Sequence, residues 1–130
     1  MRDALTNFLD GYRRAWENRD PDAVAALFTT DGTYREKPFE PTFEGHDRIR
    51  DYWAEVTAAQ SDITVRYGQP LVVGDRAAVE WWTTLTNEGS PATLAGAFLL
   101  RFAPDGRCAE LVEYFMNAED TVTPPSTWGG

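Results

Sequence analysis

Glu113 is the acidic residue whose sequence surroundings best suit proton chemistry. It shares one face of a strand-like run with Leu111 and Phe115, because side chains two residues apart point the same way on a strand. Burial between apolar side chains disfavours a charged carboxylate and raises its pKa, which suits a general acid or base near neutral pH. Two other interpretations remain open: a structural glutamate hydrogen-bonded to Tyr12, Trp16 or a buried arginine, and a glutamate that faces solvent.

Glu36 and Lys37 are the next candidates for acid–base chemistry. They are neighbours on a predicted strand over residues 33–37, so only one of them can point inward. Glu36 inward would add a second carboxylate, whereas Lys37 inward would add an ion-pair partner for Glu113 or an amine for an acidic ligand. In a third interpretation both lie at a solvated rim. Tyr34 has the same parity as Glu36 and is predicted to line the mouth of any pocket there.

Metal and cofactor chemistry is not indicated by the remaining residue types. His46 is the only histidine, and no His, Asp or Glu cluster has the spacing of metal ligands, so we expect no metal and place His46 on the surface near a helix N-terminus. No glycine-rich phosphate loop or nucleotide fingerprint occurs, and no cofactor is predicted. Cys108 is the only cysteine, which indicates a buried core residue in a reducing compartment, the cytoplasm.

Composition narrows the class of protein further. The chain has 130 residues and a net charge of −9, which disfavours nucleic acid and anionic membranes as partners. No window approaches the ~18 consecutive apolar residues of a membrane span. Five Trp, seven Phe and five Tyr must be buried somewhere, which predicts one domain with a large aromatic core.

Hydrophobic periodicity predicts an α+β fold in which helices come first and strands follow. An apolar stripe from Leu5 to Trp16 indicates a first helix, and Asp20 with Pro21 begins a second, short one. Short turns between the last strands imply antiparallel neighbours, so three helices would cover one face of a curved antiparallel sheet and leave a cavity. The expected elements are helices over 2–18, from 21 and over 46–60; an ordered loop over 38–45; strands over 33–37, 63–67, 70–73, 77–86, 92–102 and 107–117; a single domain over 1–118; and a tail over 119–130 held by Trp128.

The order of these elements and their residues resembles the nuclear-transport-factor-2-like superfamily, in its SnoaL-like branch, over about residues 4–117. This resemblance implies a cone of three N-terminal helices on a strongly curved antiparallel sheet, with a pocket inside. The superfamily contains isomerases, cyclases, hydrolases and binding modules, so it does not imply one reaction. The matching segments are Tyr12 to Val24, Phe28 to Tyr34, Pro38-Phe39, Gly45 to Ile49, Tyr52-Trp53, Leu100 to Arg107 and Glu113 to Phe115.

Ketosteroid isomerase, a member of that superfamily, provides a comparison residue by residue. Its oxyanion-donor tyrosine corresponds to Tyr12, but its carboxylate base precedes a Pro-Phe pair at the position of Lys37. Its protonated aspartic acid corresponds to Phe98, and its two supporting tyrosines correspond to Phe28 and Trp53. The resemblance therefore implies that this chain does not isomerise steroids by that mechanism.

The resemblance also implies which strand faces point inward. It places Glu113 inside with Tyr12, which is either a hydrogen-bond donor to a ligand or an amphipathic core tyrosine. The implied lining is mostly aromatic and would suit a small apolar or mixed-polarity molecule. It comprises Trp16, Phe28, Tyr34, Trp53, Val79, Trp81, Thr83, Phe98, Leu111 and Phe115.

The opposite, outward face carries an apolar strip of Trp82 alongside Ala78 and Thr84. Members of the superfamily commonly dimerise through this face, so the resemblance implies a homodimer. Three functions follow for the chain as a whole: a cofactor-free acid–base enzyme with Glu113, Tyr12, Glu36 and Lys37 as candidate catalytic residues; a non-catalytic binding module for a hydrophobic ligand; and a dimerisation module whose interior is filled by Trp and Phe.

Overall fold

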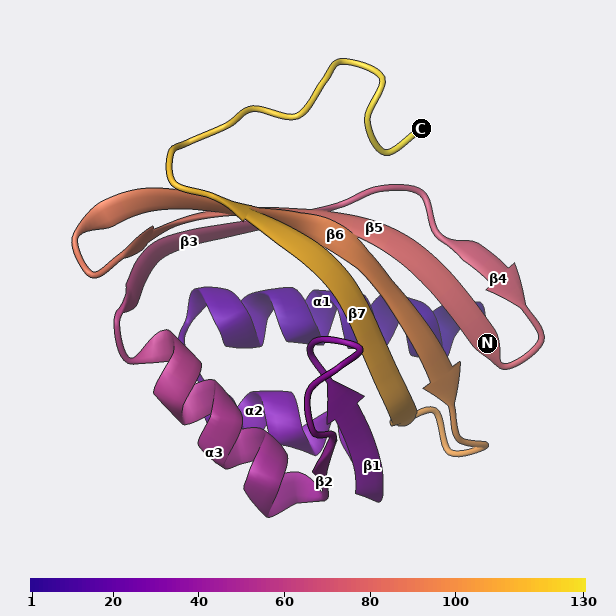
Figure 1. Cartoon of the computed structure of the whole chain (residues 1–130). Coiled ribbons are helices and arrows are strands. Elements are labelled where there is room, and N and C mark those ends of the chain that lie inside the picture. The colour runs from indigo at the N-terminus through magenta and orange to yellow at the C-terminus, as the bar shows by residue number, and fades with distance from the viewer.

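A computed structural model describes all 130 residues as helices packed against one curved sheet (Figure 1). The order of elements begins with α1 (Arg2–Glu17), α2 (Pro21–Ala26), β1 (Phe28–Arg35), β2 (Phe43–Glu44) and α3 (His46–Thr57). It continues with β3 (Gln60–Tyr67), β4 (Leu71–Val73), β5 (Arg76–Asn87), β6 (Ser90–Phe102) and β7 (Cys108–Ala118). No helix is both long enough and apolar enough to cross a membrane.

The helices form where the sequence predicts them. Asp20 caps α2 by accepting a hydrogen bond from the Ala23 amide at 3.2 Å, and Pro21 opens the helix. The third helix follows the first strand, as the predicted ranges place it, so only α1 and α2 precede every strand. Residues Phe43 and Glu44, predicted to belong to a loop, form the short strand β2 against Thr33 and Tyr34.

The sheet is mixed, whereas the sequence predicts an antiparallel one. Its strands run in the order β2-β1-β7-β6-β5-β3, and β4 pairs with β5 beside this path. Every pair is antiparallel except β1 with β7, which is parallel. This pairing joins the first strand to the last one, and no short turn connects them, so the turns of the sequence could not reveal it.

Gly96 of β6 lies opposite Phe115 of β7, where the backbone of β7 leaves no room for a side chain. A Cβ atom there would lie 2.1 Å from the carbonyl oxygen of Tyr114 and 2.6 Å from the Cβ of Phe115. No side chain fits into that space, so this position of the curved sheet requires glycine.

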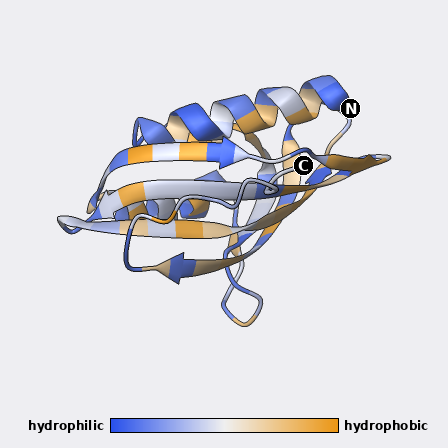
Figure 2. Ribbon diagram, turned by 90° about the horizontal axis from the view of Figure 1, so that it is seen from above, coloured by the Kyte–Doolittle hydropathy of each residue, from blue (hydrophilic) through white to orange (hydrophobic).

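The core lies between the concave face of the sheet and the helices. It is one cluster of 23 buried residues, with Tyr12 and Trp16 of α1 packed edge-on against Trp53 of α3 at ring-centroid distances of 5.4 and 5.3 Å. Figure 2 shows hydrophilic residues along the outer edge of α1 and hydrophobic segments within the strands. Cys108 is fully buried, and burial raises the pKa of its thiol to about 12, so it is a core residue.

The C-terminal segment 119–130 lies across the convex face of the sheet, opposite the helices (Figure 1). Thr93 donates to the Asp120 carbonyl at 2.7 Å, and the indole N–H of Trp82 donates to the Val122 carbonyl at 2.9 Å. Trp128 then packs against Trp82 with ring centroids 5.7 Å apart. Trp82 is therefore covered by the chain's own end, and the predicted free strip of Trp82, Ala78 and Thr84 is wrong for this part of the face.

Candidate functional site

Glu113 projects from β7 into the core, as its strand parity and the family resemblance predict. It lies opposite Phe98 of β6, and only 4% of its surface is exposed. Its partner is Tyr34 of β1, which is 1% exposed and donates its hydroxyl hydrogen to Glu113 Oε2. The parallel β1–β7 pairing brings the two together by placing Tyr34 beside Leu111. Tyr34 is predicted from its strand parity to line the pocket mouth, and its hydrogen bond to the acid is evident only in the structure.

Tyr12 is the third polar side chain of the same buried cluster. It is 1% exposed, and burial and the charge of Glu113 raise its pKa while Tyr34 lowers it, so the three groups lie close together. Tyr34 is the residue that donates to Glu113. Tyr12 is therefore placed to support Tyr34 and the acid within this cluster.

The electrostatics of this group favour neutral forms. Burial raises the pKa of Glu113 to about 8; the hydrogen bond from Tyr34 lowers it, and the nearby Glu36 carboxylate raises it. The pKa values of Tyr12 and Tyr34 lie well above the usual value, first because of burial and then because of the charge of Glu113. The two tyrosines thus remain neutral hydrogen-bond donors while Glu113 exchanges its proton near neutral pH.

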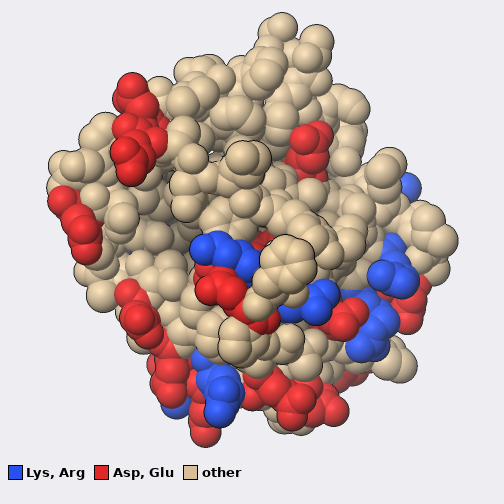
Figure 3. Space-filling model, viewed as in Figure 1, with Lys and Arg blue, Asp and Glu red and all other residues tan.

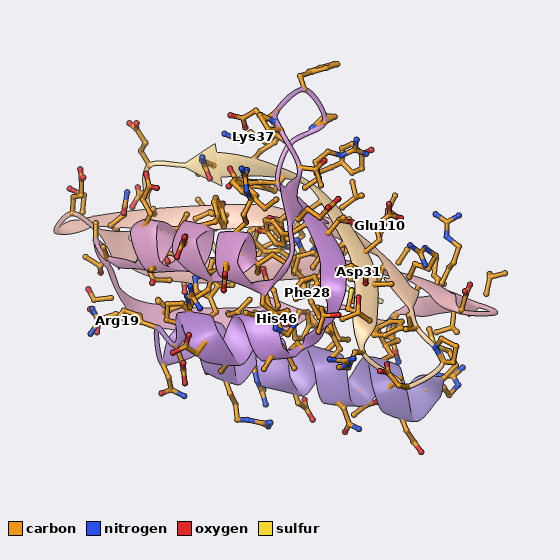
Figure 4. All side chains as sticks on the ribbon, turned by 90° about the horizontal axis from the view of Figure 1, so that it is seen from below. Arg19, Phe28, Asp31, Lys37, His46 and Glu110 are labelled. Carbon is orange, nitrogen blue, oxygen red and sulfur yellow. The ribbon has the colours of Figure 1, made fainter.

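Glu36 and Lys37 lie just beyond the end of β1, at the rim of the molecule. Lys37 Nζ is 3.6 Å from Glu36 Oε1 and 3.8 Å from Glu40 Oε2, and its side chain is half-exposed. Figure 4 shows Lys37 at the β1–β2 loop, away from the labelled Phe28 and His46. Lys37 therefore pairs with these rim carboxylates and not with Glu113. The Glu36 side chain is 17% exposed, and burial raises its pKa.

A hollow of about 640 Å³ lies on the outer side of this rim. The rings of Phe43 and Tyr52 stand at its inner wall with centroids 4.5 Å apart, and the Tyr52 ring is 5.3 Å from that of Tyr34. One aromatic layer therefore separates the hollow from the Tyr34–Glu113 pair. Figure 3 shows that acidic side chains outnumber basic ones over α3, which forms one side. The hollow is lined by Glu36, Glu40, Pro41, Phe43, Arg48, Asp51, Tyr52, Glu55 and Val56.

Nine of the ten residues predicted to line a pocket occupy the packed interior, and none of the ten lines the hollow. Trp81 stacks on Phe98 at 5.5 Å and meets Trp16 edge-on at 5.7 Å, so aromatic rings fill much of the expected volume. Phe115 is half-buried at the rim, where Lys37 Nζ lies 5.8 Å from its ring centroid. The others are at most 4% exposed: Trp16, Phe28, Tyr34, Trp53, Val79, Trp81, Thr83, Phe98 and Leu111.

Several residues of this region were not singled out by sequence analysis. Phe43 and Tyr52 could not be predicted because their contact depends on the β1–β2 pairing. Gln60 could not be predicted because its side-chain oxygen accepts from the Trp16 indole at 2.9 Å, across 44 residues of sequence. Tyr67 has a strand parity that would have revealed it, since it points the same way as Val65. His46 begins α3, as predicted, and is half-buried rather than free at the surface, because its Nε2 donates to the Phe28 carbonyl at 2.8 Å and joins α3 to β1 (Figure 4). No group of three His, Cys, Asp or Glu residues is arranged to hold a metal ion.

The fold and the family are established by comparison with known proteins. The family model for the SnoaL-like domain matches residues 9–111, and the chain belongs to this family. None of the curated proteins searched matches the chain. The chain shares the ketosteroid isomerase-like, NTF2-like fold with solved structures.

Three of these structures cover most of the chain. A hypothetical protein of ketosteroid isomerase-like fold from Catenulispora acidiphila, in complex with trimethylamine, is 24% identical with a TM-score of 0.74, over 82% of this chain and 83% of that one. The epoxide hydrolase/cyclase-like enzyme SalBIII, described in pyran ring formation in salinomycin, is 19% identical with a TM-score of 0.74, over 85% and 89%. A ketosteroid isomerase-like protein from Erwinia carotovora atroseptica is 24% identical with a TM-score of 0.69, over 88% and 95%.

Proposed function

We propose that this SnoaL-like protein is a cofactor-free acid–base enzyme of the isomerase, cyclase or hydrolase type that acts on a small apolar or mixed-polarity molecule. The observation that carries the proposal is Glu113, buried in an aromatic interior and held by a hydrogen bond from Tyr34. Perturbed carboxylic acids of this kind concentrate at functional sites.

The proposed chemistry is a proton transfer through Glu113. In the ionised form Glu113 takes a proton from a C–H or O–H group of the ligand, and in the protonated form it returns that proton at another atom. The atoms balance without a redox partner. A pKa of about 8 keeps both forms populated near neutral pH, which is the condition for efficient acid–base catalysis. Tyr34, supported by Tyr12, acts as a positioning residue that orients the carboxyl group.

The hollow beside α3 is the proposed entrance. Rotation of Phe43 and Tyr52 would connect it with the Tyr34–Glu113 pair behind them. Glu36 and Lys37 at its rim are candidates to assist the ligand or the proton, as the sequence suggests. Two structural neighbours support a small-molecule role: the trimethylamine complex and the epoxide hydrolase/cyclase-like SalBIII.

Two probe reactions test the proposal on the full chain. Deuterium uptake by the methyl group of acetophenone in D2O reports a general base, and hydrolysis of styrene oxide reports a general acid or base. We expect the protein to accelerate at least one of them, with deuterium uptake rising as pH passes through about 8 because Glu113 ionises there. Glu113→Gln should reduce that rate about 10²–10⁴-fold.

Glu110→Gln is the matched control for this test. Glu110 lies on the same strand, its side chain is 44% exposed, and it faces away from the core (Figure 4). It should leave both rates unchanged. The acid–base proposal is wrong if neither reaction is accelerated, or if Glu113→Gln and Glu110→Gln behave alike.

A non-catalytic binding module is the second candidate, favoured by the close packing of rings around Trp16, Trp53 and Trp81. It predicts that the same probes raise the thermal unfolding temperature and are recovered unchanged. The single buried cysteine supports a reducing compartment such as the cytoplasm.

We also propose a homodimer through the part of the convex face that segment 119–130 leaves open. Leu99 is 38% exposed there, beside Leu71 and Val73 at 72% and 79%, and together they line an apolar groove. An open apolar surface of this kind is typical of an interface between copies.

A further inference from the structure

Four polar side-chain atoms of the concave interior have no hydrogen-bond partner: Trp53 Nε1, Tyr67 Oη, Trp81 Nε1 and Thr83 Oγ1. Trp53, Trp81 and Thr83 are 3%, 1% and 0% exposed, so bulk solvent does not reach them. A buried donor without a partner destabilises the folded state, and native proteins leave few of them. Four in one interior therefore call for a ligand that supplies the missing acceptors.

Three of the four groups converge on one strand pair. Tyr67 of β3 is directly opposite Trp81 of β5, and Thr83 follows two residues later on the same face. Side chains that are directly opposite in an antiparallel pair have Cβ atoms about 5 Å apart. We call Tyr67, Trp81 and Thr83 the donor trio.

The surroundings of the donor trio are mostly aromatic, and no acceptor lies within hydrogen-bonding distance of its three polar atoms. Trp81 contacts the rings of Trp16, Phe98 and Phe115 at centroid distances of 5.7, 5.5 and 5.7 Å. The chain does supply acceptors to other indoles, since Trp16 donates to the Gln60 side chain and Trp82 to the Val122 carbonyl, both at 2.9 Å. Arg35 Nε, next to Tyr34 on β1, also lacks a partner, but the other four such atoms all lie in the concave interior.

We propose that the donor trio binds the oxygen acceptors of a neutral molecule, such as a carbonyl or ether oxygen. The proposal rests on the proposed function in placing the ligand inside the core. An anion is disfavoured because no Lys or Arg is among the buried residues and Glu113 is the one buried carboxylic acid. The Trp81 indole can only donate, and the hydroxyls of Tyr67 and Thr83 can donate beside it, so the trio suits an oxygen acceptor.

Trp53 extends the same chemistry toward the acid. Its ring lies 6.1 Å from that of Tyr34 and 5.9 Å from that of Tyr52, between the outer hollow and the Glu113 group. A ligand that enters past Tyr52 therefore meets the Trp53 donor first and the donor trio deeper in the core. Acceptor-bearing molecules would be selected over hydrocarbons of the same shape.

Acetophenone and α-methylstyrene provide a matched pair of probes, because they differ in a carbonyl oxygen against a CH2 group of similar size. Each is titrated into the 15N-labelled full chain, and the five indole N–H signals are followed by NMR. Trp53→Phe and Trp81→Phe assign the two signals of interest. Acetophenone should move the Trp81 or Trp53 signal downfield more than α-methylstyrene does, while Trp16 and Trp82 keep their existing partners and move little.

The affinities provide a second readout. Acetophenone should bind about tenfold more tightly than α-methylstyrene, the effect of one to two neutral hydrogen bonds. Tyr67→Phe removes only the trio's hydroxyl and should reduce this preference several-fold. Tyr114→Phe, a hydroxyl deletion at an exposed site on the convex face, should leave it intact. Equal affinity for the two probes, or equal movement of the Trp16 and Trp81 signals, would mean that water satisfies these donors and would overturn the proposal.

The outcome is separable from that of the proposed function. The indole shifts report binding whether or not the probe is converted, and we expect them in Glu113→Gln as well as in the native chain. Loss of deuterium uptake with retained indole shifts contradicts catalysis alone. Normal catalysis without indole shifts contradicts the donor trio alone.

Discussion

At the scale of single residues, the pKa of Glu113 is set by the free-energy cost of burying its carboxylate in the core. Its carboxyl group has one hydrogen-bond donor, Tyr34, and that donor is itself supported by Tyr12. One neutral hydrogen bond does not replace the hydration that a carboxylate loses on burial, which is why the pKa rises despite it. The same imbalance makes Glu113 chemically useful and energetically unfavourable when charged.

This cost predicts how stability depends on pH. The pKa of Glu113 rises from 4.5 to about 8 on folding, so the folded chain holds the proton more tightly than the unfolded chain. Its contribution to stability is complete below pH 4.5 and is lost as pH rises to about 8, at about 1.4 kcal/mol per pH unit. Glu113→Gln should therefore gain in stability relative to the native chain across that interval.

Urea unfolding between pH 5 and 9 measures this difference, with Glu110→Gln as the control. Because Glu110 is half-exposed, that variant should follow the native pH dependence. A difference between Glu113→Gln and the native chain that does not change with pH would contradict a buried, titrating Glu113.

At the scale of elements, the β6–β7 pair positions the acid. Phe98 and Glu113 face each other across it, and two residues further along Gly96 faces Phe115. The backbone of β7 approaches Gly96 so closely that no side chain fits there. The strand register that places Glu113 therefore requires glycine at this position. The parallel β1–β7 pair then adds Tyr34 from the other side.

Gly96→Ala should destabilise the protein by at least about 1–3 kcal/mol, the usual cost of overpacking, because the new methyl group meets backbone that cannot rotate away. Ala97→Ser, on the opposite face of the same strand, should change stability by less than about 0.5 kcal/mol. Chemical denaturation of both variants checks this. If the two are equally stable, the strands can separate at Gly96 and the close approach is not a constraint.

At the scale of the whole molecule, the two faces of the sheet have separate roles. The concave face is closed by helices and contains Glu113, whereas the convex face is divided between the C-terminal segment and an open apolar region. Gln69 donates to the Gly129 carbonyl at 2.8 Å, so the segment is held at its far end as well as at Thr93. It covers Trp82 and leaves Leu71, Val73 and Leu99 open.

Light scattering tests the homodimer proposed for this open region. The expected mass is twice the 14.6 kDa of one chain at micromolar concentration. Leu99→Glu should return the protein to a single chain, because it places a charge in the apolar interface. Phe39→Ser, at a 99% exposed position in the β1–β2 loop, should leave the mass unchanged. A native mass of 14.6 kDa contradicts the dimer.

Much of this protein could be predicted from local patterns in its sequence. The 3.6-residue periodicity of α1, the cap at Asp20 and the two-residue alternation of β5 to β7 depend on neighbours within a few positions. Alternation puts Glu113 on one face with Leu111 and Phe115, and the family resemblance indicates that this face is the inner one. The resulting prediction of a buried acid is confirmed by its 4% exposure.

Only the tertiary structure decided which residues contact that acid. Tyr34 and Glu113 are 79 residues apart and meet through a parallel pairing that no turn or local repeat encodes. The Phe43–Tyr52 contact at the hollow is likewise visible only in the structure. So is the packing of the C-terminal segment over Trp82, which the sequence pattern shows only as an apolar residue facing outward. Local sequence determines which side of an element is apolar, but contacts between distant segments depend on how the strands pair and the chain packs, and these decide what Glu113 can do.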